Sequence, residues 1–454
     1  MPTSPMTPIF PPEIEAEILL RLPAKSLQRF KSVCKSWRFL ISSDALFSAS
    51  FYRRSDQNPQ LLFLKHPPNS LKTPIHFSIA SIQSNSIVET TTLPLPNNVV
   101  SPLLIPTKVE LINSNSVNGI VGIVVYLGFY NGPSDVRCES YIWNPSTSES
   151  VKLPNSEVSG LFNGPPMVKF YSGFGVGSGI ENVGLDYKVV RVVYTGSGNA
   201  MCEVYSIRGN CWKKLPFGLA NSSNTLWASE MCTFVDGVGY WGVYKRERKD
   251  NFSVLGFDFS KERFKNIKVP EVCVDGGERK FHSLWEYRGD LALSVLHFGG
   301  FETGSSRIYI WVFTQRGGLC EDFEQCWSTV FNIDLECGPR RPVVSLDSRE
   351  VVLLGEDDDE HVLYDSVNGH VKMVSVCDVD HVVVYVESLV SLRSLLPKED
   401  RSSTDLIDSL NDEEGIMCSS STDLIDSLKY EEGIMCSMSS RLPSPHAGGR
   451  SASW

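Results

Sequence analysis

The sequence predicts a multidomain α + β protein with a small N-terminal helical module, an all-β propeller-like domain and a disordered acidic C-terminal tail. Three observations predict this organisation. Apolar residues recur at helical spacing between 10 and 54, short β-type runs recur from 60 to 395, and acidic and serine residues dominate 396–454. We expect residues 1–9 to be disordered. A chain of 454 residues allows two or three domains.

The N-terminal module is predicted to contain three short helices. Pro11 and Pro12 suit a first helical turn, where a missing N–H costs nothing, and Pro23 ends that run. So small a unit cannot bury all of its apolar side chains, and the excess is expected to lie against another protein or the second domain. Two apolar stripes follow the helical period, the first formed by Ile14, Ile18 and Leu22 and the second by Leu27, Phe30, Val33, Cys34, Trp37, Leu40 and Ile41.

The module is also basic. Between Pro11 and Arg54, five Arg and three Lys face three Glu and one Asp, a local charge of +4. Such a surface suits an acidic partner. The alternative is that these charges belong to an ordinary solvent-exposed helical face that has no partner. Lys25, Lys31 and Lys35 are the candidates for steering that partner.

The stretch LPAKSLQRFKSVCKSWRFLIS, preceded by IEAEILLR, closely resembles the F-box of plant F-box proteins. One departure is Phe10-Pro11, where the family usually has Leu-Pro. The resemblance implies docking onto the acidic and apolar Skp-type adaptor of a cullin-based ubiquitin ligase; the alternative is a helical hairpin that caps the second domain. The residues expected at the adaptor interface are Pro11, Ile14, Ile18, Leu19, Leu22, Pro23, Leu27, Phe30, Val33, Cys34 and Trp37.

From residue 60 the chain is rich in β-branched and aromatic runs separated by Gly, Pro, Asn and Ser clusters. Aromatic residues that end a strand advance from Phe77 by 66, 62, 52, 54 and 53 residues, through Trp143, Tyr205, Phe257 and Trp311 to Tyr364. This period is close to the roughly 50 residues of a kelch-type blade. The spacing predicts a β-propeller of about six blades, with five to seven possible and a pair of β-sandwiches as the alternative.

This β-rich region also resembles the F-box-associated domain of the same plant family. Coverage runs from about 60 to 392. The departures are Val117, where the family commonly has Cys, and an insertion between Gly175 and Asp186. The resemblance is carried by SVNGIVGI (Ser116–Ile123), IWNPSTSE (Ile142–Glu149), GFG (Gly173–Gly175), DYKVVRV (Asp186–Val192) and VYSIRGNCWKKLP (Val204–Pro216).

The sequence contains few motifs for catalysis or metal binding, and those are incomplete. We expect no catalytic residue, no metal and no cofactor. The glycines of Ser172–Gly179 miss the G-x-G-x-x-G spacing and indicate a loop or a close approach between strands. Glu356–His361 is expected to form an acidic hairpin turn rather than a calcium site. His282, His361 and His381 are expected to be structural or exposed. Core positions are expected for most of Trp143, Trp212, Trp241, Trp285, Trp311 and Trp327.

Composition excludes several classes of protein. The twelve cysteines form no C-x-x-C pair, which favours reduced thiols in a cytoplasmic or nuclear protein. No signal peptide or membrane span is predicted. Of the net charge of -11, residues 399–437 contribute -9, so the remaining body is nearly neutral and a nucleic-acid partner is not expected.

The tail contains a duplication. STDLIDSLNDEEGIMCS (Ser403–Ser419) recurs 18 residues later as STDLIDSLKYEEGIMCS (Ser421–Ser437). Disorder is the first interpretation, and a bivalent short binding motif is the second.

Together these features predict the substrate-recognition subunit of an SCF-type ubiquitin ligase, not an enzyme. The adaptor would connect it to a cullin and a RING subunit, and loops of the β-domain would bind an unidentified target protein. The alternatives are a propeller that binds a small molecule or glycan, with a non-degradative scaffold role for the F-box, and a propeller oxidoreductase, which the scattered histidines disfavour. Candidate target-binding loops are Asn131–Glu139, Ser159–Pro166, Gly177–Gly184, Ala220–Ser229 and Phe298–Ser306.

Overall fold

The structure is a computed structural model, and it divides the chain into two units, residues 1–397 and 398–454. All described residues belong to the first unit, and the expected tail with its duplication lies outside them. The described residues are 11–65, 75–83, 86–96, 104–129, 132–156, 169–178, 185–194, 200–216, 225–227, 231–245, 248–274, 280–298, 306–314, 326–335, 340–345, 350–355, 361–365, 367–374 and 379–397.

The described part of the N-terminal module contains four helices, α1 (Pro12–Leu20), α2 (Ala24–Phe30), α3 (Lys35–Ser43) and α4 (Ala45–Asp56). The prediction of three was wrong because the polar turn before α4 is a helix cap. The Asp44 side chain there accepts a hydrogen bond from the backbone N–H of Phe47 at 2.8 Å, which starts a new helix. Cys34 caps α3 in the same way, through Trp37 N at 3.4 Å.

The core of the N-terminal module is formed by apolar side chains from all four helices and one residue from the distant C-terminal part of the described chain. Phe47 and Phe51 lie one turn apart on the inner face of α4. Leu389 completes the cluster, so the module is not closed by its own residues alone. The buried members are Leu19, Ala24, Leu27, Ile41, Phe47, Phe51 and Leu389.

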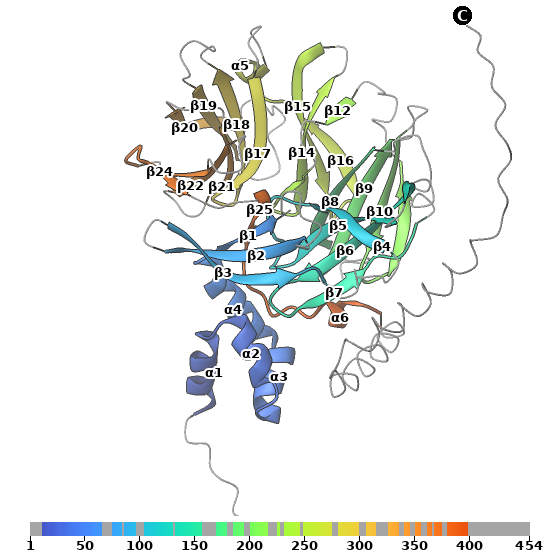
Figure 1. Ribbon diagram of the computed structural model, residues 1–454, viewed down its shortest axis with the longest axis vertical. Coiled ribbons are helices and arrows are strands. Elements are labelled where there is room, and N and C mark those ends of the chain that lie inside the picture. Colours follow the sequence, from blue (N-terminus) through green and yellow to red (C-terminus); the bar gives the residue numbers. More distant parts are fainter. Residues whose placement is uncertain are drawn as a thin grey trace, which may run out of the picture. The chain divides into compact units, whose positions relative to one another are not determined.

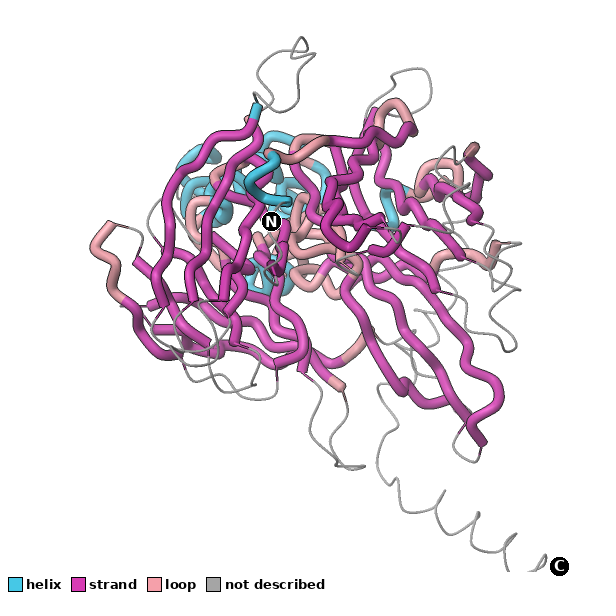
Figure 2. Tube along the Cα trace, turned by 90° about the horizontal axis from the view of Figure 1, so that it is seen from above, coloured by secondary structure: helices cyan, strands magenta, loops and turns pink. Residues whose placement is uncertain are grey.

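The described strands beyond the N-terminal module form six antiparallel sheets, arranged around a common centre (Figures 1 and 2). In spatial order, the first sheet is β25 (Val379–Tyr385), β1 (Gln60–Lys65), β2 (His76–Gln83) and β3 (Ser86–Pro94), and the second is β4 (Leu104–Leu111), β5 (Val121–Phe129), β6 (Gly132–Asn144) and β7 (Glu149–Lys152). The third is β8 (Lys169–Ser178), β9 (Leu185–Tyr194), β10 (Ala200–Ser206) and β11 (Cys211–Leu215).

The fourth sheet has five strands, and the last two sheets have four each. The fourth is β12 (Thr225–Trp227) and β13 (Thr233–Val235), which both pair with β14 (Val238–Lys245), followed by β15 (Arg248–Asp258) and β16 (Arg263–Ile267). After the short helix α5 (Glu271–Val274) come β17 (Lys280–Tyr287), β18 (Asp290–Phe298), β19 (Ser306–Phe313) and β20 (Trp327–Leu335), then β21 (Arg340–Ser345), β22 (Glu350–Gly355), β23 (His361–Asp365) and β24 (Val371–Val374).

The propeller architecture is confirmed, and the sandwich alternative is wrong. Each of the six predicted aromatic anchors lies in the third strand of its own sheet. The recurrence therefore marks the same strand of each sheet, although Phe77 lies near the start of its strand and the other five anchors lie near the ends of theirs. The tryptophan prediction is confirmed as well, since Trp143, Trp241, Trp285 and Trp327 are buried.

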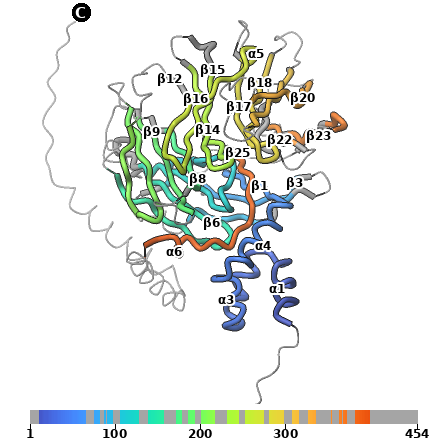
Figure 3. The backbone as a smooth tube through the Cα atoms, turned by 180° about the vertical axis from the view of Figure 1, so that it is seen from behind, coloured from blue at the N-terminus to red at the C-terminus, as the bar shows by residue number. Residues whose placement is uncertain are grey.

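The first sheet combines the first strands of the propeller sequence with its last strand. β25 pairs with β1 in antiparallel register, with Leu62 opposite Val383. The chain then continues as a segment that we call the closing strap (386–397), which carries α6 (Leu392–Leu395) (Figure 3). The helix α6 contacts β7. Two hydrogen bonds from Asn144 Nδ2, to the carbonyls of Ser388 and Val390, fix the closing strap to the second sheet.

A polar segment between β4 and β5, the central segment (112–120), joins several sheets. Asn113 exchanges two hydrogen bonds with the backbone of Phe174 in β8, at 2.6 Å and 3.0 Å. Asn115 does the same with Phe234 in β13, at 2.7 Å and 3.0 Å, and also donates to Glu286 in β17 at 2.9 Å. The side chains of the central segment thus link neighbouring sheets, together with backbone bridges from Asn113 to Cys232 and from Asn115 to Val384.

His282 in β17 connects the fourth and fifth sheets. Its Nε2 lies 2.8 Å from the Cys273 carbonyl oxygen and its Nδ1 2.9 Å from the Tyr244 hydroxyl. The Phe252 ring stacks on the imidazole at a centroid distance of 4.0 Å. Burial lowers the pKa of His282 to about 4, so the imidazole is neutral at pH 7.

We expect the stability of the protein to fall in mild acid because of His282. A histidine with a depressed folded-state pKa stabilises the fold fully above its unfolded pKa near 6.5, and this contribution is lost as the pH falls towards 4. The loss should be about 2 kcal/mol, measured by urea unfolding at pH 7 and pH 4.5. His282→Gln should remove most of this pH dependence, and His370→Gln, at an exposed position, should preserve it. An identical pH dependence in the wild type and His282→Gln would contradict the assignment.

Candidate adaptor-docking surface

The helices of the N-terminal module expose large apolar side chains. Ile14 is 46% exposed, Ile18 49% and Val33 59%, and Phe39 and Leu46 reach 64% and 80%. Single exposed apolar residues are ordinary, but five within one module of four helices indicate a surface that another protein covers.

The predicted interface residues fall into three groups by exposure. Leu19 and Leu27 are buried in the core of the N-terminal module, so they support the interface from behind and do not form it. The partly buried group is Leu22, Phe30 and Trp37, and the exposed group is Pro11, Ile14, Ile18, Pro23, Val33 and Cys34.

Trp37 holds the first and third helices at a fixed separation. Its indole Nε1 donates to Glu15 Oε2 in α1 at 3.1 Å. Its ring also packs against Phe30, with the centroids 5.5 Å apart. Trp37 therefore fixes the position of α3 relative to α1 and leaves part of its indole ring exposed at the surface.

Sequence reasoning missed Phe39 and Leu46. Both lie off the apolar stripes, Phe39 two residues before the buried Ile41 and Leu46 directly before the buried Phe47. An apolar residue on the polar side of an amphipathic helix was the available signal.

The predicted steering lysines differ in their surroundings. Lys25 and Lys35 are exposed. Lys31 is partly buried, and desolvation lowers its pKa while the nearby Glu149 of β7 opposes that shift. Lys31 therefore belongs to the contact with the propeller, which leaves Lys25 and Lys35 for a partner.

The closing strap attaches the N-terminal module to the propeller. The backbone N–H of Ala24, at the start of α2, donates to Glu387 Oε2 at 3.3 Å, and Leu389 packs in the core of the module. Burial raises the pKa of Glu387. Burial also raises the pKa of Tyr52 in α4, with Asp56 and Glu286 adding to the shift.

The predicted target-binding loops are mostly outside the described residues. Two of them were wrong as loops, because β6 already begins at Gly132 within Asn131–Glu139 and β12 (Thr225–Trp227) lies within Ala220–Ser229. Most of the acidic stretch Glu356–His361 also lies outside, apart from His361 in β23. Across the described part of the chain, no three His, Cys, Asp or Glu side chains gather as metal ligands, and no described helix is long and apolar enough to cross a membrane.

The fold and the exposed helical surface define a docking module carried on a β-propeller. A family model for the F-box domain matches residues 8–48, and one for the F-box associated beta propeller domain matches residues 133–392. The chain belongs to the family of F-box proteins with an F-box-associated propeller.

Its relatives include plant F-box proteins. F-box protein At5g49610 of Arabidopsis thaliana is 26% identical over 342 residues, which is 72% of this chain and 80% of the relative. F-box/kelch-repeat protein At3g23880 of Arabidopsis thaliana is 25% identical over 392 residues, 85% of this chain and 96% of the relative.

Proposed function

We propose that this protein is the substrate-recognition subunit of an SCF-type ubiquitin ligase and has no catalytic activity of its own. The observation that carries the proposal is the exposure of the apolar side chains Ile14, Ile18 and Val33 on one small F-box module that a β-propeller supports. A Skp-type adaptor with an apolar and acidic surface would cover this face and connect it to a cullin and a RING subunit.

The attachment of the F-box to the propeller supports this role. A ubiquitin ligase receptor acts by proximity, because it holds a target near the transferring enzyme. The bond from Ala24 to Glu387 and the packing of Leu389 hold the F-box directly against the closing strap. We infer domain boundaries of 10–54 for the F-box and 60–395 for the propeller, with 1–9 and 396–454 as flanking segments.

The described cysteines are consistent with a reducing compartment such as the cytoplasm or the nucleus. Cys202, Cys232 and Cys273 are free thiols in buried positions. Burial raises the pKa of Cys202 and of Cys273 to about 12, which makes both thiols unreactive.

The test is adaptor binding by the full-length protein. Ile18→Asp combined with Val33→Asp should weaken binding to a purified Skp-type adaptor about thirtyfold, because two charges would face an apolar, acidic surface. Both side chains are exposed, so the fold should not change. Val367→Asp makes the same kind of change at a propeller position that is 64% exposed and should leave affinity unaltered.

Surface plasmon resonance on the immobilised adaptor would measure the affinities, and circular dichroism would show that each variant is folded. A folded wild-type chain without affinity for the adaptor, or equal affinity in the F-box variant and the Val367→Asp control, would refute the proposed function.

A further inference from the structure

The outer edges of the third and fourth sheets carry a concentration of basic residues. These two sheets are neighbours, since their side chains form one buried cluster. β8 and β13 contact the central segment, and β11 and β16 lie at the opposite, outer edges of the same sheets. The exposed cations of these outer strands and of the residues directly beside β16 are called the basic rim here; they are Lys213, Lys214, Lys261, Arg263, Lys265 and Lys268.

A carboxylate bridge connects the two outer strands. Glu262, in the turn before β16, accepts a hydrogen bond from Lys213 Nζ of β11 at 2.8 Å and another from Lys188 Nζ of β9 at 2.9 Å. Because Lys213 and Glu262 belong to different sheets, this contact places β11 beside the start of β16. The two strands therefore border one region of the surface.

The basic rim has an excess of positive charge that the other outer strands lack. Its six cations are accompanied by two carboxylates in the same strands and turns, Asp258 and Glu262, which leaves a local charge of +4. Lysine on an edge strand ordinarily hinders pairing with another chain, but that role would call for it on all six outer strands. The outer strands β3 and β20 contain no Lys or Arg, and β7 and β24 contain one Lys each. The restriction to two neighbouring strands indicates a binding surface.

The basic rim already stabilises carboxylates of the chain itself. Burial alone would raise the pKa of Glu262, but hydrogen bonds from Lys213 and Lys188 outweigh it and lower the pKa. Burial of Asp258 is likewise outweighed, and hydrogen bonds from the backbone and side chain of Lys261 lower its pKa. The Lys213 and Lys261 side chains stay 65% and 76% exposed while they make these contacts. The field at the basic rim therefore favours ionised carboxylates, the groups that an acidic peptide would bring.

The aromatic residues of the two outer strands are engaged inside the propeller. The Trp212 ring lies 4.3 Å from the Arg191 guanidinium and 5.4 Å from the Tyr205 ring. Phe264 packs on Phe257 with the ring centroids 4.7 Å apart. Single-stranded nucleic acids bind proteins by stacking bases on exposed aromatic rings, and these two rings are already packed. The basic rim therefore suits carboxylates of a protein better than a nucleic acid.

We propose that the basic rim binds an extended acidic segment of the target protein. The inference rests on the proposed function, in which the propeller holds a target. A strand rises about 3.4 Å per residue, so β16 from Arg263 to Lys268 covers about 17 Å, the length of an extended segment of about six residues. Carboxylates along such a segment would pair with the lysine and arginine head groups, whose flexible stems can reach it from both strands.

The test uses the full-length protein and a fluorescein-labelled peptide of six glutamates. Fluorescence anisotropy at about 50 mM salt, where charges are weakly screened, should detect binding with a Kd of about 0.1 mM or below. A peptide of six glutamines keeps the length and removes the charge, so it should bind at least about thirtyfold more weakly. Salt at about 0.5 M should abolish binding of the glutamate peptide.

Matched variants assign the binding to the basic rim. Lys265→Glu should weaken binding of the glutamate peptide about tenfold, and Lys265→Arg, which keeps the charge, should preserve it. Lys372→Glu makes the same charge reversal on β24, another outer strand, and should leave binding almost unchanged. Both positions are exposed, and circular dichroism would show that each variant is folded.

Several results would overturn the proposal. They are no binding of the glutamate peptide, equal binding of the glutamine peptide, or equal affinities of Lys265→Glu and Lys372→Glu. Tighter binding of an oligouridylate of equal charge would identify a nucleic acid as the partner. Tighter binding of a synthetic peptide with the sequence Ser403–Ser419 would overturn the assignment to a target protein. Adaptor affinity is measured separately, so loss of adaptor binding with intact peptide binding would refute the proposed function alone.

Discussion

Asn113→Ala should lower the free energy of unfolding by about 4 kcal/mol, since a buried, unsatisfied backbone group costs about 1–3 kcal/mol and the substitution leaves two. Asn113 is 3% exposed, and its amide bonds to both the N–H and the carbonyl of Phe174. Alanine can replace neither bond. Urea unfolding of the full-length chain, followed by tryptophan fluorescence, would measure the loss.

Two further variants make this prediction specific. Asn113→Leu has nearly the same size but no polar atoms, so it should be destabilised to a similar extent if the hydrogen bonds matter more than volume. Asn368→Ala, in the exposed turn between β23 and β24, loses only a bond to Asp365 and should cost less than about 1 kcal/mol. A loss at Asn113→Ala no larger than at this control would show that the Asn113 side chain does not hold the second and third sheets together.

The second large effect is expected at Gly175 in β8. A methyl group there would lie less than 3.0 Å from ring atoms of Phe259 and Phe234 in the next sheet. Real side chains do not tolerate such contacts, so Gly175→Ala should move the two sheets apart or force the rings from their positions. We expect a loss of about 3 kcal/mol in the free energy of unfolding, from overpacking.

Gly256→Ala is the matched control for this prediction, because Gly256 also lies within a strand of the propeller. The nearest atom to its added methyl group would be Tyr240 Cε1 at 3.4 Å, an ordinary contact. Thermal unfolding of both variants should show a clear decrease in the melting temperature for Gly175→Ala and little change for Gly256→Ala. Similar melting temperatures would mean that the interface between the third and fourth sheets can relax around a methyl group.

The same glycines show what the sequence could and could not predict about the fold. Gly173, Gly175 and Gly177 were expected in a loop or at a close approach between strands, and the structure places them in β8 against Trp241 and Phe259. The close approach was a correct expectation. The identity of the opposing aromatic residues was not accessible, because it depends on which sheets become neighbours.

Local periodicity predicted most of the architecture. The helical stripe around Leu27 and the aromatic anchors from Phe77 to Tyr364 repeat within short stretches of sequence, so they report secondary structure directly. The helix α4 was missed because Asp44 was not recognised as a cap. Asn113 and Asn115 were missed because their partners, Phe174 and Phe234, are distant in sequence.

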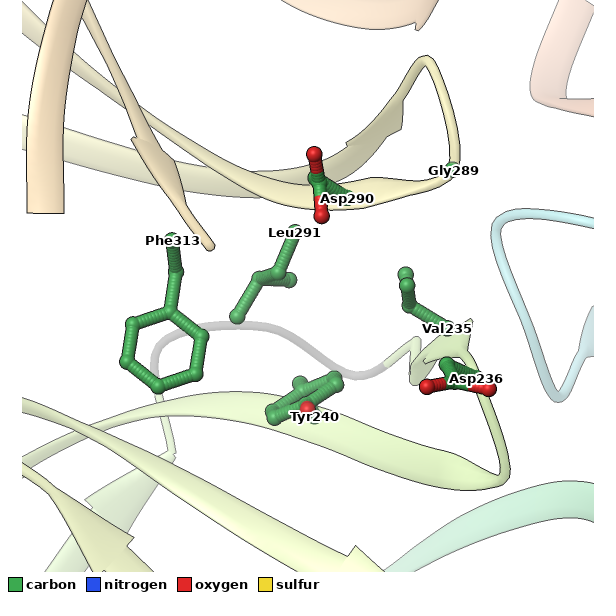
Figure 4. Close-up of a pocket in the computed structure, with 7 residues that line it drawn as sticks. All are labelled: Val235, Asp236, Tyr240, Gly289, Asp290, Leu291 and Phe313. Atoms are coloured by element: carbon green, nitrogen blue, oxygen red, sulfur yellow. The ribbon is translucent and has the colours of Figure 1, made fainter. Parts of the chain in front are cut away.

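The candidate sites show the same limit. The exposed residues Ile14, Ile18 and Val33 belong to stripes that the sequence displays. A pocket in the propeller (Figure 4) combines residues from two hairpin turns, around Asp236 and Gly289, that meet only when the fourth and fifth sheets pack together. No single stretch of sequence contains that arrangement.

Because β25 closes the first sheet and the strap that follows contacts the F-box, this protein is completed by the part of the propeller that the ribosome makes last. The F-box helices are synthesised first, yet Ala24 and Glu387 are separated by 363 residues. A growing or prematurely terminated chain would therefore have F-box helices without a closed ring beside them. Translation through residue 397 is a condition for joining the two parts, so we expect the F-box and the propeller to become coupled only after the last strand of the propeller has been made.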